Sequence, residues 1–515
     1  MKTQLNDVCP PWFHLLFLAA LGSMILSCSA PDPGAEKNLS NALAAIEYPS
    51  DLDPALADAY SAIRPMLAYN TCKWLSLPRY AGRYPGTPEY KAVCEWIAGL
   101  FANWGLEPIG KDGSFLQAYH SPYTVIHEAT MSLFVPGADG SDAIEEVVVE
   151  GGTGFLPLLY SASGEAEGGV VFAGWGISAP DLGYDDYAGI DVKDKFVLCF
   201  RGTPDRANKT YEPHDHHRKR METAKDRGAL GLIYIYDDVG ANPNGDRIEG
   251  FLPVTVDFAT ADRLLAASEI EADALRRELR ESKKPRSFET PCRVRLKVDA
   301  QFVADGEAYN VVGWIEGSDP VLKKEFIIIG GHLDHCGLHM GLLFTGANDN
   351  ASGSACVIEA ARAFSRLDRP PKRSVLFALF GGEEMGLEGS LHLADNLPPA
   401  VESVSAMLNL DMEGEGDGTG AVIAPDHPEF REALEKADET VGTLRRIREF
   451  SGPPGVRGSD YAAFYAKGIP CMAFWSNGPH LHYHQPGDTI YRINPDMLAD
   501  VSRLSFLTVY YLADL

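Results

Sequence analysis

The sequence predicts an α/β protein in which a mainly parallel sheet is sandwiched by helices and a β-rich domain is inserted. Continuous aliphatic runs at residues 325–332, 372–382 and 405–412 indicate fully buried strands. Between the first two runs, residues 352–367 have the apolar face of a helix. Buried strands separated by helices indicate a parallel sheet covered on both faces. Short β-rich runs within residues 125–302, broken by glycine, proline and aspartate, indicate a second domain of different character.

The chain has 515 residues, which is more than one hydrophobic core usually holds. We therefore expect a main domain formed by residues 51–124 and 303–515, with residues 125–302 inserted between its two parts. The main domain is expected to begin with helices. Residues 89–105 place four apolar side chains at helical spacing, and Gly105 can end that helix.

The composition excludes two classes of protein. An apolar share of 45% can fill a core, so a disordered chain is excluded. The 45 lysines and arginines against 72 aspartates and glutamates give a net charge of −27. Binding to nucleic acid requires a basic face that neutralises phosphates, and the sequence offers none. The acidity otherwise concerns solubility and leaves the oligomeric state open.

The N-terminus has the pattern of a secretion signal. Residues 12–26 form an apolar run that is shorter than the roughly 20 residues of a membrane span. Residues 25–28 (ILSC) resemble the bacterial lipobox, which implies removal of residues 1–27 and a lipid on Cys28; the alternative is an ordinary signal with a coincidental cysteine. Residues 28–50 then form a polar tether. We expect an exported bacterial lipoprotein, periplasmic or anchored to the outer membrane, which contacts a membrane only through its lipid.

Cysteine usage does not define a disulfide framework. Seven cysteines follow Cys28, so at least one of them is unpaired within the chain. In an exported protein Cys72 and Cys94 could pair, but spacing alone does not fix the connectivity. The absence of any CxxC spacing argues against a zinc site made of cysteines.

Polar residues follow each predicted strand of the main domain, and open α/β sheets form their sites at that edge. The first strand ends at His332, which can offer a ring nitrogen to zinc, while Asp334 can accept the other ring N–H. A structural histidine–aspartate pair is the alternative. The run 348–350 (Asn-Asp-Asn) opens the next helix and is more polar than a helix cap requires.

The adjacent pair Glu383 and Glu384 follows the second buried strand. Two neighbouring carboxylates there cost desolvation and repulsion unless a cation is present, although a solvated acidic turn is the alternative. One glutamate can bind a metal while the other faces a metal-bound water. Asp411 ends the third strand and can bind a metal; the alternative is a role as a cap. Residues 480–484 hold three histidines, which could also form a surface cluster.

Together these groups are more specific than each one alone. Two histidines, two aspartates and a glutamate can build two zinc sites that share a carboxylate. Two metals about 3.5–4 Å apart hold a bridging water. The remaining glutamate can take the proton of that water as a general base.

Five motifs resemble those of peptidase family M28, the co-catalytic zinc aminopeptidases. They are GGHLDH (330–335), GANDNASG (346–353), GGEEMGLEGS (381–390), NLDM (409–412) and HYHQPGDT (482–489). Residues 83–108 also resemble the usual lead-in of that family, and residues 171–200 resemble the protease-associated (PA) domain inserted in many members. The resemblance implies a zinc exopeptidase fold with a PA-like insert, peptide substrates and two zinc ions per chain.

Carried over to this sequence, the resemblance assigns five metal ligands. His332 and Asp411 bind one zinc, Glu384 and His484 bind the other, and Asp349 bridges both.

The resemblance also implies roles around the metals. Glu383 is the general base and later protonates the leaving amine, and Asp334 orients the first zinc histidine. The loop with Asp460 and Tyr461 lies at the substrate. Two positions depart from the family pattern: histidine is usual at Tyr461, and aspartate is usual at His482. Neither is a metal ligand, but both bear on specificity.

Several alternatives remain open at this stage. The same scaffold supports carboxypeptidases and glutaminyl cyclases, the latter with one zinc. A non-catalytic peptidase-like binding module would have lost ligands, whereas here all five and Glu383 are present. A calcium site is disfavoured because calcium prefers oxygen ligands over histidine. The run 215–217 (Asp-His-His) in the insert is expected to be solvated rather than metal-binding.

Overall fold

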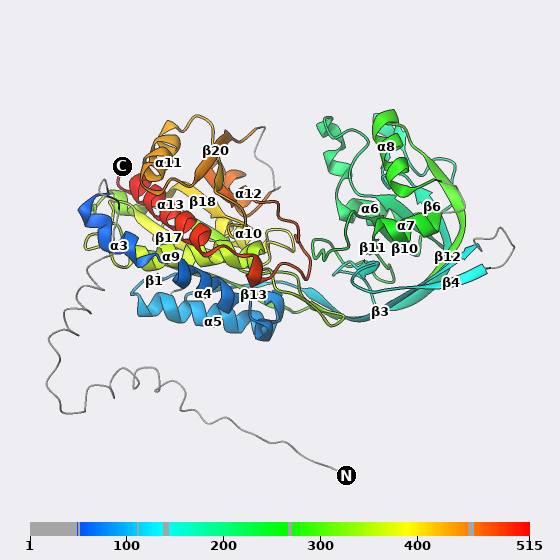
Figure 1. Cartoon of the computed structure of the whole chain (residues 1–515), viewed down its shortest axis with the longest axis horizontal. Helices are drawn as coiled ribbons and strands as arrows, with labels where there is room; N and C mark the ends of the chain where they lie inside the picture. Colours follow the sequence, from blue (N-terminus) through cyan, green and yellow to red (C-terminus); the bar gives the residue numbers. More distant parts are fainter. Residues whose placement is uncertain (1–48, 50–51, 111–112, 137–143, 266–269, 452–457) are drawn as a thin grey trace, which may run out of the picture. The chain divides into compact units, whose positions relative to one another are not determined.

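Two large sheets, built from different parts of the chain, organise the computed structural model of the protein (Figure 1). The structure describes residue 49 and residues 52–515, apart from 111–112, 137–143, 266–269 and 452–457. The predicted signal, Cys28 and almost all of the tether lie outside the described residues. In the described part of the chain, no helix is both long and apolar enough to span a membrane.

The first sheet has nine strands in the order β1-β13-β17-β14-β18-β21-β19-β20, and β2 pairs with β13. The strands are β1 (Glu107–Pro108), β2 (Leu116–His120), β13 (Glu307–Ile315), β14 (Glu325–His332), β17 (Ser374–Phe380), β18 (Ser403–Leu410), β19 (Thr419–Ile423), β20 (Leu444–Glu449) and β21 (Cys471–Ser476). The predicted strands at 325–332, 372–382 and 405–412 correspond to β14, β17 and β18.

This sheet is parallel at its centre and mixed at its flanks. The pairings of β17 with β14, β14 with β18 and β18 with β21 are parallel. On one side, β13 runs antiparallel to β17 and β2, and on the other β19 runs antiparallel to β21. The prediction of a mainly parallel sheet is therefore right only for the centre. Aliphatic strands identify the buried centre, whereas strand direction at the flanks depends on how the chain returns there.

Helices cover both faces of this sheet, as predicted. Alternate residues of β14 point to opposite faces, so Ile327 and Ile329 pack in a core with side chains of α4, α5, α9 and α13. Phe326 and Ile328 pack in another core with α10 and α12 on the opposite face. The helices are α3 (Ala57–Ala62), α4 (Pro65–Leu75), α5 (Pro88–Asn103), α9 (Gly353–Phe364), α10 (Glu388–Asp395), α11 (Pro428–Val441), α12 (Tyr461–Tyr465) and α13 (Pro495–Ala513).

Helix α5 confirms the helix predicted over residues 89–105. Val93, Ile97 and Phe101 are fully buried on one side of it, which is the face that the apolar spacing predicts. The helix ends at Asn103, and Gly105 follows with a φ of +74°, a value that glycine adopts without strain.

The second sheet has eight strands in the order β4-β3-β12-β6-β9-β10-β11-β5. They are β3 (Tyr123–Pro136), β4 (Ile144–Val149), β5 (Phe155–Pro157), β6 (Gly164–Ala173), β9 (Lys195–Phe200), β10 (Gly231–Ile235), β11 (Val254–Val256) and β12 (Ser287–Val303). Helices α6 (His217–Lys225), α7 (Phe258–Leu265) and α8 (Ala272–Ser282) accompany it, and two small hairpins pair β7 (Ser178–Ala179) with β8 (Tyr184–Asp185) and β15 (Gly337–His339) with β16 (Leu342–Phe344).

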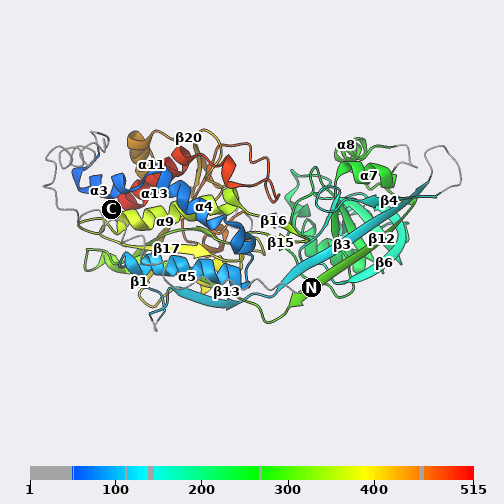
Figure 2. The same cartoon turned by 60° about the horizontal axis from the view of Figure 1, so that its bottom comes forward.

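The long antiparallel strands β3 and β12 begin and end this second sheet along the chain (Figure 2). In β12, buried Val294, Leu296 and Val298 alternate with exposed residues, so one side of the strand packs on the core. The sheet thus runs from residue 123 to residue 303, close to the predicted insert of 125–302. Residues 51–515 nevertheless form one compact unit, and the division into separate domains stays a prediction.

The seven described cysteines are all buried and unpaired. The disulfide between Cys72 and Cys94 that the sequence allowed is therefore not formed. Cys72 lies in α4 and donates its S–H to the carbonyl of Ala347 (3.3 Å), while Cys94 is buried in α5. Both cysteines thus act as small core residues.

Candidate metal centre

The predicted ligands gather at the carboxyl edge of the central parallel strands. His332 is the last residue of β14, Asp411 follows β18 directly, and Glu384 lies in the turn after β17. Asp349 comes from the turn before α9, and His484 from the loop after β21. Neighbouring parallel strands end at the same edge, so residues far apart in the sequence meet there. The structure brings all five together.

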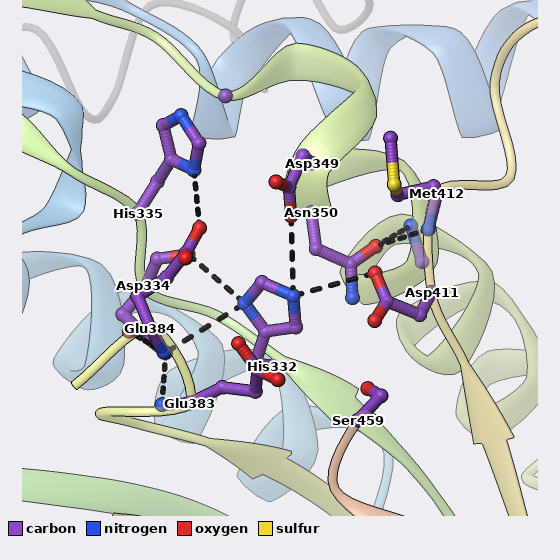
Figure 3. A network of polar contacts seen from close by, with 12 residues as sticks. His332, Asp334, His335, Asp349, Asn350, Glu383, Glu384, Asp411, Met412 and Ser459 are labelled. Carbon is purple, nitrogen blue, oxygen red and sulfur yellow. Dashed lines mark hydrogen bonds and ion pairs between the residues drawn. The ribbon is translucent and has the colours of Figure 1, made fainter. Parts of the chain in front are cut away.

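The two oxygens of the Asp349 carboxylate face two different histidines. Oδ1 lies 3.3 Å from His332 Nε2, and that same nitrogen lies 3.4 Å from Asp411 Oδ1. Figure 3 shows one nitrogen of the His332 ring joined to both Asp349 and Asp411. Oδ2 of Asp349 lies 3.3 Å from His484 Nε2, which is 2.8 Å from Glu384 Oε2. The five residues thus form two groups that share Asp349. The first group is His332, Asp411 and Asp349, and the second group is His484, Glu384 and Asp349.

The arrangement fits two zinc ions. A tetrahedral zinc with nitrogen and oxygen ligands at about 2.0–2.2 Å places neighbouring ligand atoms about 3.3–3.6 Å apart, and three of the four measured distances lie in this range. Asp349 Oδ2, Asp411 Oδ1 and His484 Nε2 are buried without a hydrogen-bond partner. Such atoms are costly unless something else satisfies them, and a metal ion would do so. Imidazole and carboxylate are ligands that zinc prefers.

The pKa values of the two adjacent glutamates are shifted in opposite directions. Burial raises the pKa of Glu383 well above its ordinary value, and the Glu384 charge adds to the shift while His332 opposes it. Burial acts the same way on Glu384, but the charge of His484 and the hydrogen bond from His335 outweigh it and lower its pKa to about 2. Carboxylates with pKa values pushed apart are the pattern of an acid–base pair: Glu384 stays ionised, and Glu383 can hold a proton.

Asp334 supports more of the site than the sequence predicted. The Nδ1 of His332 lies 3.2 Å from the main-chain carbonyl of Asp334 and 3.7 Å from its carboxylate Oδ1. The same carboxylate accepts the main-chain N–H groups of Glu383 (3.2 Å) and Glu384 (3.3 Å) (Figure 3). Burial raises the pKa of Asp334 to about 8. One side chain therefore holds the turn that carries both glutamates and lies behind the first histidine.

His335 belongs to the site although no role was predicted for it from the sequence. It is fully buried, and its Nδ1 donates to Glu384 Oε1 at 2.8 Å. Its place in the motif GGHLDH, three residues after His332, could have indicated a role in the site. Its partner Glu384 is 49 residues away in the sequence and could not be identified from the motif.

Asp488 was also missed. Its carboxylate accepts the main-chain N–H groups of Asn348 (2.8 Å) and Asp349 (2.9 Å). It therefore fixes the turn that presents the shared ligand. Asp488 is the one acid of the motif HYHQPGDT, in which only the histidines suggested a role in the site.

The histidine cluster at residues 480–484 separates into three roles. His484 alone reaches the ligands. His480 lies 2.9 Å from the side-chain nitrogen of Asn348 and 3.0 Å from the carbonyl of Ser476, and His482 lies 3.3 Å from Gln485 Oε1. The departure from the family pattern at His482 thus lies in the loop that carries His484, but its Nδ1 is directed to Gln485.

Asp460 and Tyr461 lie close enough to interact with the first group of ligands. Asp460 is fully buried, and burial raises its pKa to about 7 while the His332 charge lowers it and the Asp411 charge raises it. Burial and the Asp411 charge raise the pKa of Tyr461, whose ring packs on Phe450 with centroids 4.9 Å apart. Their substrate role stays a prediction.

Residues 310–509 match the family model described as peptidase family M28. This segment belongs to peptidase family M28. The M28 segment runs from β13 into α13 and contains all five candidate ligands together with Glu383. The second sheet, at residues 123–303, lies outside it.

Two proteins are similar to this chain over different lengths. Leupeptin-inactivating enzyme 1 of Streptomyces exfoliatus is 32% identical over 173 residues, which cover 33% of this chain and 36% of that protein. An aminopeptidase of Pseudomonas aeruginosa is 26% identical over 458 residues, which cover 81% of this chain and 74% of that protein. The chain thus spans about a third of the length of the former and about three quarters of the latter.

Solved structures show the same fold. An aminopeptidase from Aneurinibacillus sp. strain AM-1 has a TM-score of 0.59 at 22% identity and covers 88% of this chain and 95% of its own. A structure described as a peptidase M28 precursor from Shewanella amazonensis has a TM-score of 0.63 at 18% identity, with 89% and 96% coverage. The predicted α/β fold is confirmed.

Proposed function

We propose that the protein is a dizinc metallo-exopeptidase, an aminopeptidase that removes N-terminal residues from peptides. The observation that carries the proposal is the Asp349 carboxylate, whose two oxygens each lie 3.3 Å from a different histidine. A simple histidine–carboxylate pair would need only one histidine, whereas a carboxylate that bridges two metals lies between the ligands of both. His332 and Asp411 would hold one zinc, and His484 and Glu384 the other.

When bound, the two zinc ions would lower the pKa of a shared water and polarise the scissile carbonyl. The protein's own contribution is the control of the proton. Glu383, whose pKa is raised by burial and by Glu384, can take the proton of the water and hold it. It can then deliver the proton to the leaving amine. The hydrogen bonds from the main chain of the two glutamates to Asp334 keep this turn in place.

The choice of an aminopeptidase over a carboxypeptidase is supported by relatives named for that activity. They are the aminopeptidase from Pseudomonas aeruginosa and aminopeptidase YwaD of Bacillus subtilis, which is 24% identical over 68% of this chain.

The test combines a zinc count with a substrate panel. The purified protein is expected to hold two zinc ions per chain and to cleave aminoacyl-p-nitroanilides, but not C-terminal dipeptide substrates. One zinc with cyclisation of N-terminal glutamine would point to a glutaminyl cyclase instead. Absence of bound zinc and of turnover would point to a peptidase-like binding module.

We also propose that the chain is an exported lipoprotein whose body is tethered through Cys28. The support is the apolar N-terminal run followed by the sequence ILSC. Metabolic labelling with a radioactive fatty acid is expected to mark the wild-type protein but not a Cys28→Ala variant. Equal labelling of both would contradict the proposal.

A further inference from the structure

A loop of the second sheet touches the metal centre directly. Residues 240–244 lie between β10 and β11. The main chain of Ala241 makes two hydrogen bonds with His484: its N–H donates to the His484 carbonyl (2.8 Å), and its carbonyl accepts from His484 Nδ1 (2.9 Å). The main-chain N–H and C=O of Ala241 thus both bond to the same candidate zinc ligand.

We infer that this loop is a positioning element that sets the tautomer and orientation of His484. A neutral imidazole carries one N–H, and here the carbonyl of Ala241 requires it on Nδ1. The lone pair of Nε2 is then free, and that atom faces Asp349 and Glu384. A main-chain carbonyl behind a metal-binding histidine fixes its ring and raises its basicity. The inference rests on the proposed function, because it assigns His484 to a zinc ion.

The backbone of His484 needs this support. Its φ is +57°, in the left-handed region that a histidine rarely adopts. The two bonds to Ala241 hold the carbonyl and the ring of the same residue at once. Because they act on both ends of His484, the strained backbone and the ring direction are fixed together.

The loop itself is anchored in the second sheet. The carbonyl of Asn242 accepts the N–H of Leu159 (3.0 Å), its Oδ1 accepts the N–H of Asn244 (2.9 Å), and its Nδ2 lies 3.2 Å from His217 Nε2. His217 is buried, and burial lowers its pKa, so its neutral ring can accept that hydrogen bond. The expectation that the run 215–217 is solvated is therefore wrong for His217.

The loop also approaches the turn that carries Glu384. A Cβ placed on Gly386, two residues after Glu384, would lie 3.5 Å from Asn244 Oδ1. A Cβ placed on Gly240 would lie 3.1 Å from the carbonyl oxygen of His484, which is closer than ordinary contact. The loop thus fits between the turns that present His484 and Glu384, and it has no spare room at Gly240.

The experiment uses that lack of room. In Gly240→Ala, the added methyl group must push His484 away, whereas Gly240 has an ordinary backbone φ that alanine can adopt. Gly164→Ala is the matched control, because Gly164 is exposed in the same sheet and its Cβ would meet only Leu252, at 3.9 Å. Asn242→Ala loosens the loop without adding atoms near His484.

The readout is the affinity of each zinc ion, measured by competition with a chelator, alongside the melting temperature of the zinc-free protein. We expect Gly240→Ala and Asn242→Ala to lower the affinity for one of the two zinc ions about 10–100-fold, the usual effect of losing a residue that supports a metal ligand. The other zinc ion and the zinc-free melting temperature should match the Gly164→Ala control. If Gly240→Ala does not fold, Asn242→Ala decides alone.

The outcomes separate the inference from the proposed function. Wild-type affinity for both zinc ions in the two loop variants, or an equal loss of both ions, overturns the inference while leaving the aminopeptidase proposal intact. A wild-type protein that binds no zinc overturns the proposed function itself, and the inference with it.

Discussion

His335 donates a hydrogen bond from Nδ1 to Oε1 of Glu384 at 2.8 Å, which leaves Oε2 as the oxygen that faces His484. The two atoms are fully or almost fully buried, so this bond is formed away from competing water. The bond orients the carboxylate so that Oε2 is the oxygen nearer to His484. The relationship predicts that His335 controls how Glu384 binds zinc.

Replacement of His335 should therefore weaken the second zinc ion. His335→Leu removes the donor and is expected to reduce the affinity for one of the two ions about 10–100-fold. His335→Asn restores an N–H at a similar distance and should recover part of the affinity. Chelator competition measures both. Equal zinc affinity in His335→Leu and the wild type would show that Glu384 does not depend on this bond.

Glu383→Gln tests the general base. The amide keeps the size of the side chain but cannot take a proton, so we expect two bound zinc ions and a loss of at least about 10²-fold in kcat. Zinc content by mass spectrometry and turnover of an aminoacyl substrate are the two measurements. Turnover near that of the wild type would remove Glu383 from this role.

Asp349→Ala tests the shared ligand. Since each oxygen of Asp349 serves one group of ligands, its removal should cost both zinc ions and the activity. Asp411→Ala is the comparison, because Asp411 lies beside His332 only and its loss should weaken one ion. The zinc count per chain distinguishes the two variants. Two ions retained by Asp349→Ala would refute the bridging arrangement.

Asp186 predicts a pH dependence of stability in the second sheet, away from the metals. Burial raises its pKa to about 7, even though its carboxylate accepts hydrogen bonds from Trp175, Ile177 and Tyr184 that favour the charged form. The folded protein therefore binds more protons than the unfolded chain between the ordinary pKa of 3.8 and about 7. The free energy of unfolding must fall as the pH rises through this window.

The size of that fall is at most about 4 kcal/mol, since each pKa unit corresponds to about 1.4 kcal/mol. Asp186→Asn removes the titrating group and should flatten this part of the curve. Denaturant unfolding of the zinc-free protein at several pH values measures it, with the exposed Asp181→Asn as control. An unchanged slope in Asp186→Asn would contradict the prediction.

The sequence alone determined which residues stand at the edge of the sheet. Strand ends are local features, because an aliphatic run followed by a polar residue marks them without knowledge of the fold. His332, Glu384 and Asp411 were found in this way, and Asp349 and His484 from dense polar motifs. The helices on both faces followed from the same local patterns, whereas the antiparallel flanks did not, since strand direction depends on the path of the chain.

How these residues are held depends on the packing of distant segments of the chain. Ala241 and His484 are 243 residues apart, and Ala241 makes the contact through its main-chain atoms, so no side-chain pattern at residues 240–244 could reveal it. The bond from His335 to Glu384 likewise joins two turns that follow different strands. Hydrogen-bond partners depend on how segments approach one another in space, and a sequence motif records the atoms that are available but not their distances. The candidate ligands were therefore readable from the sequence, but the residues that support them were not.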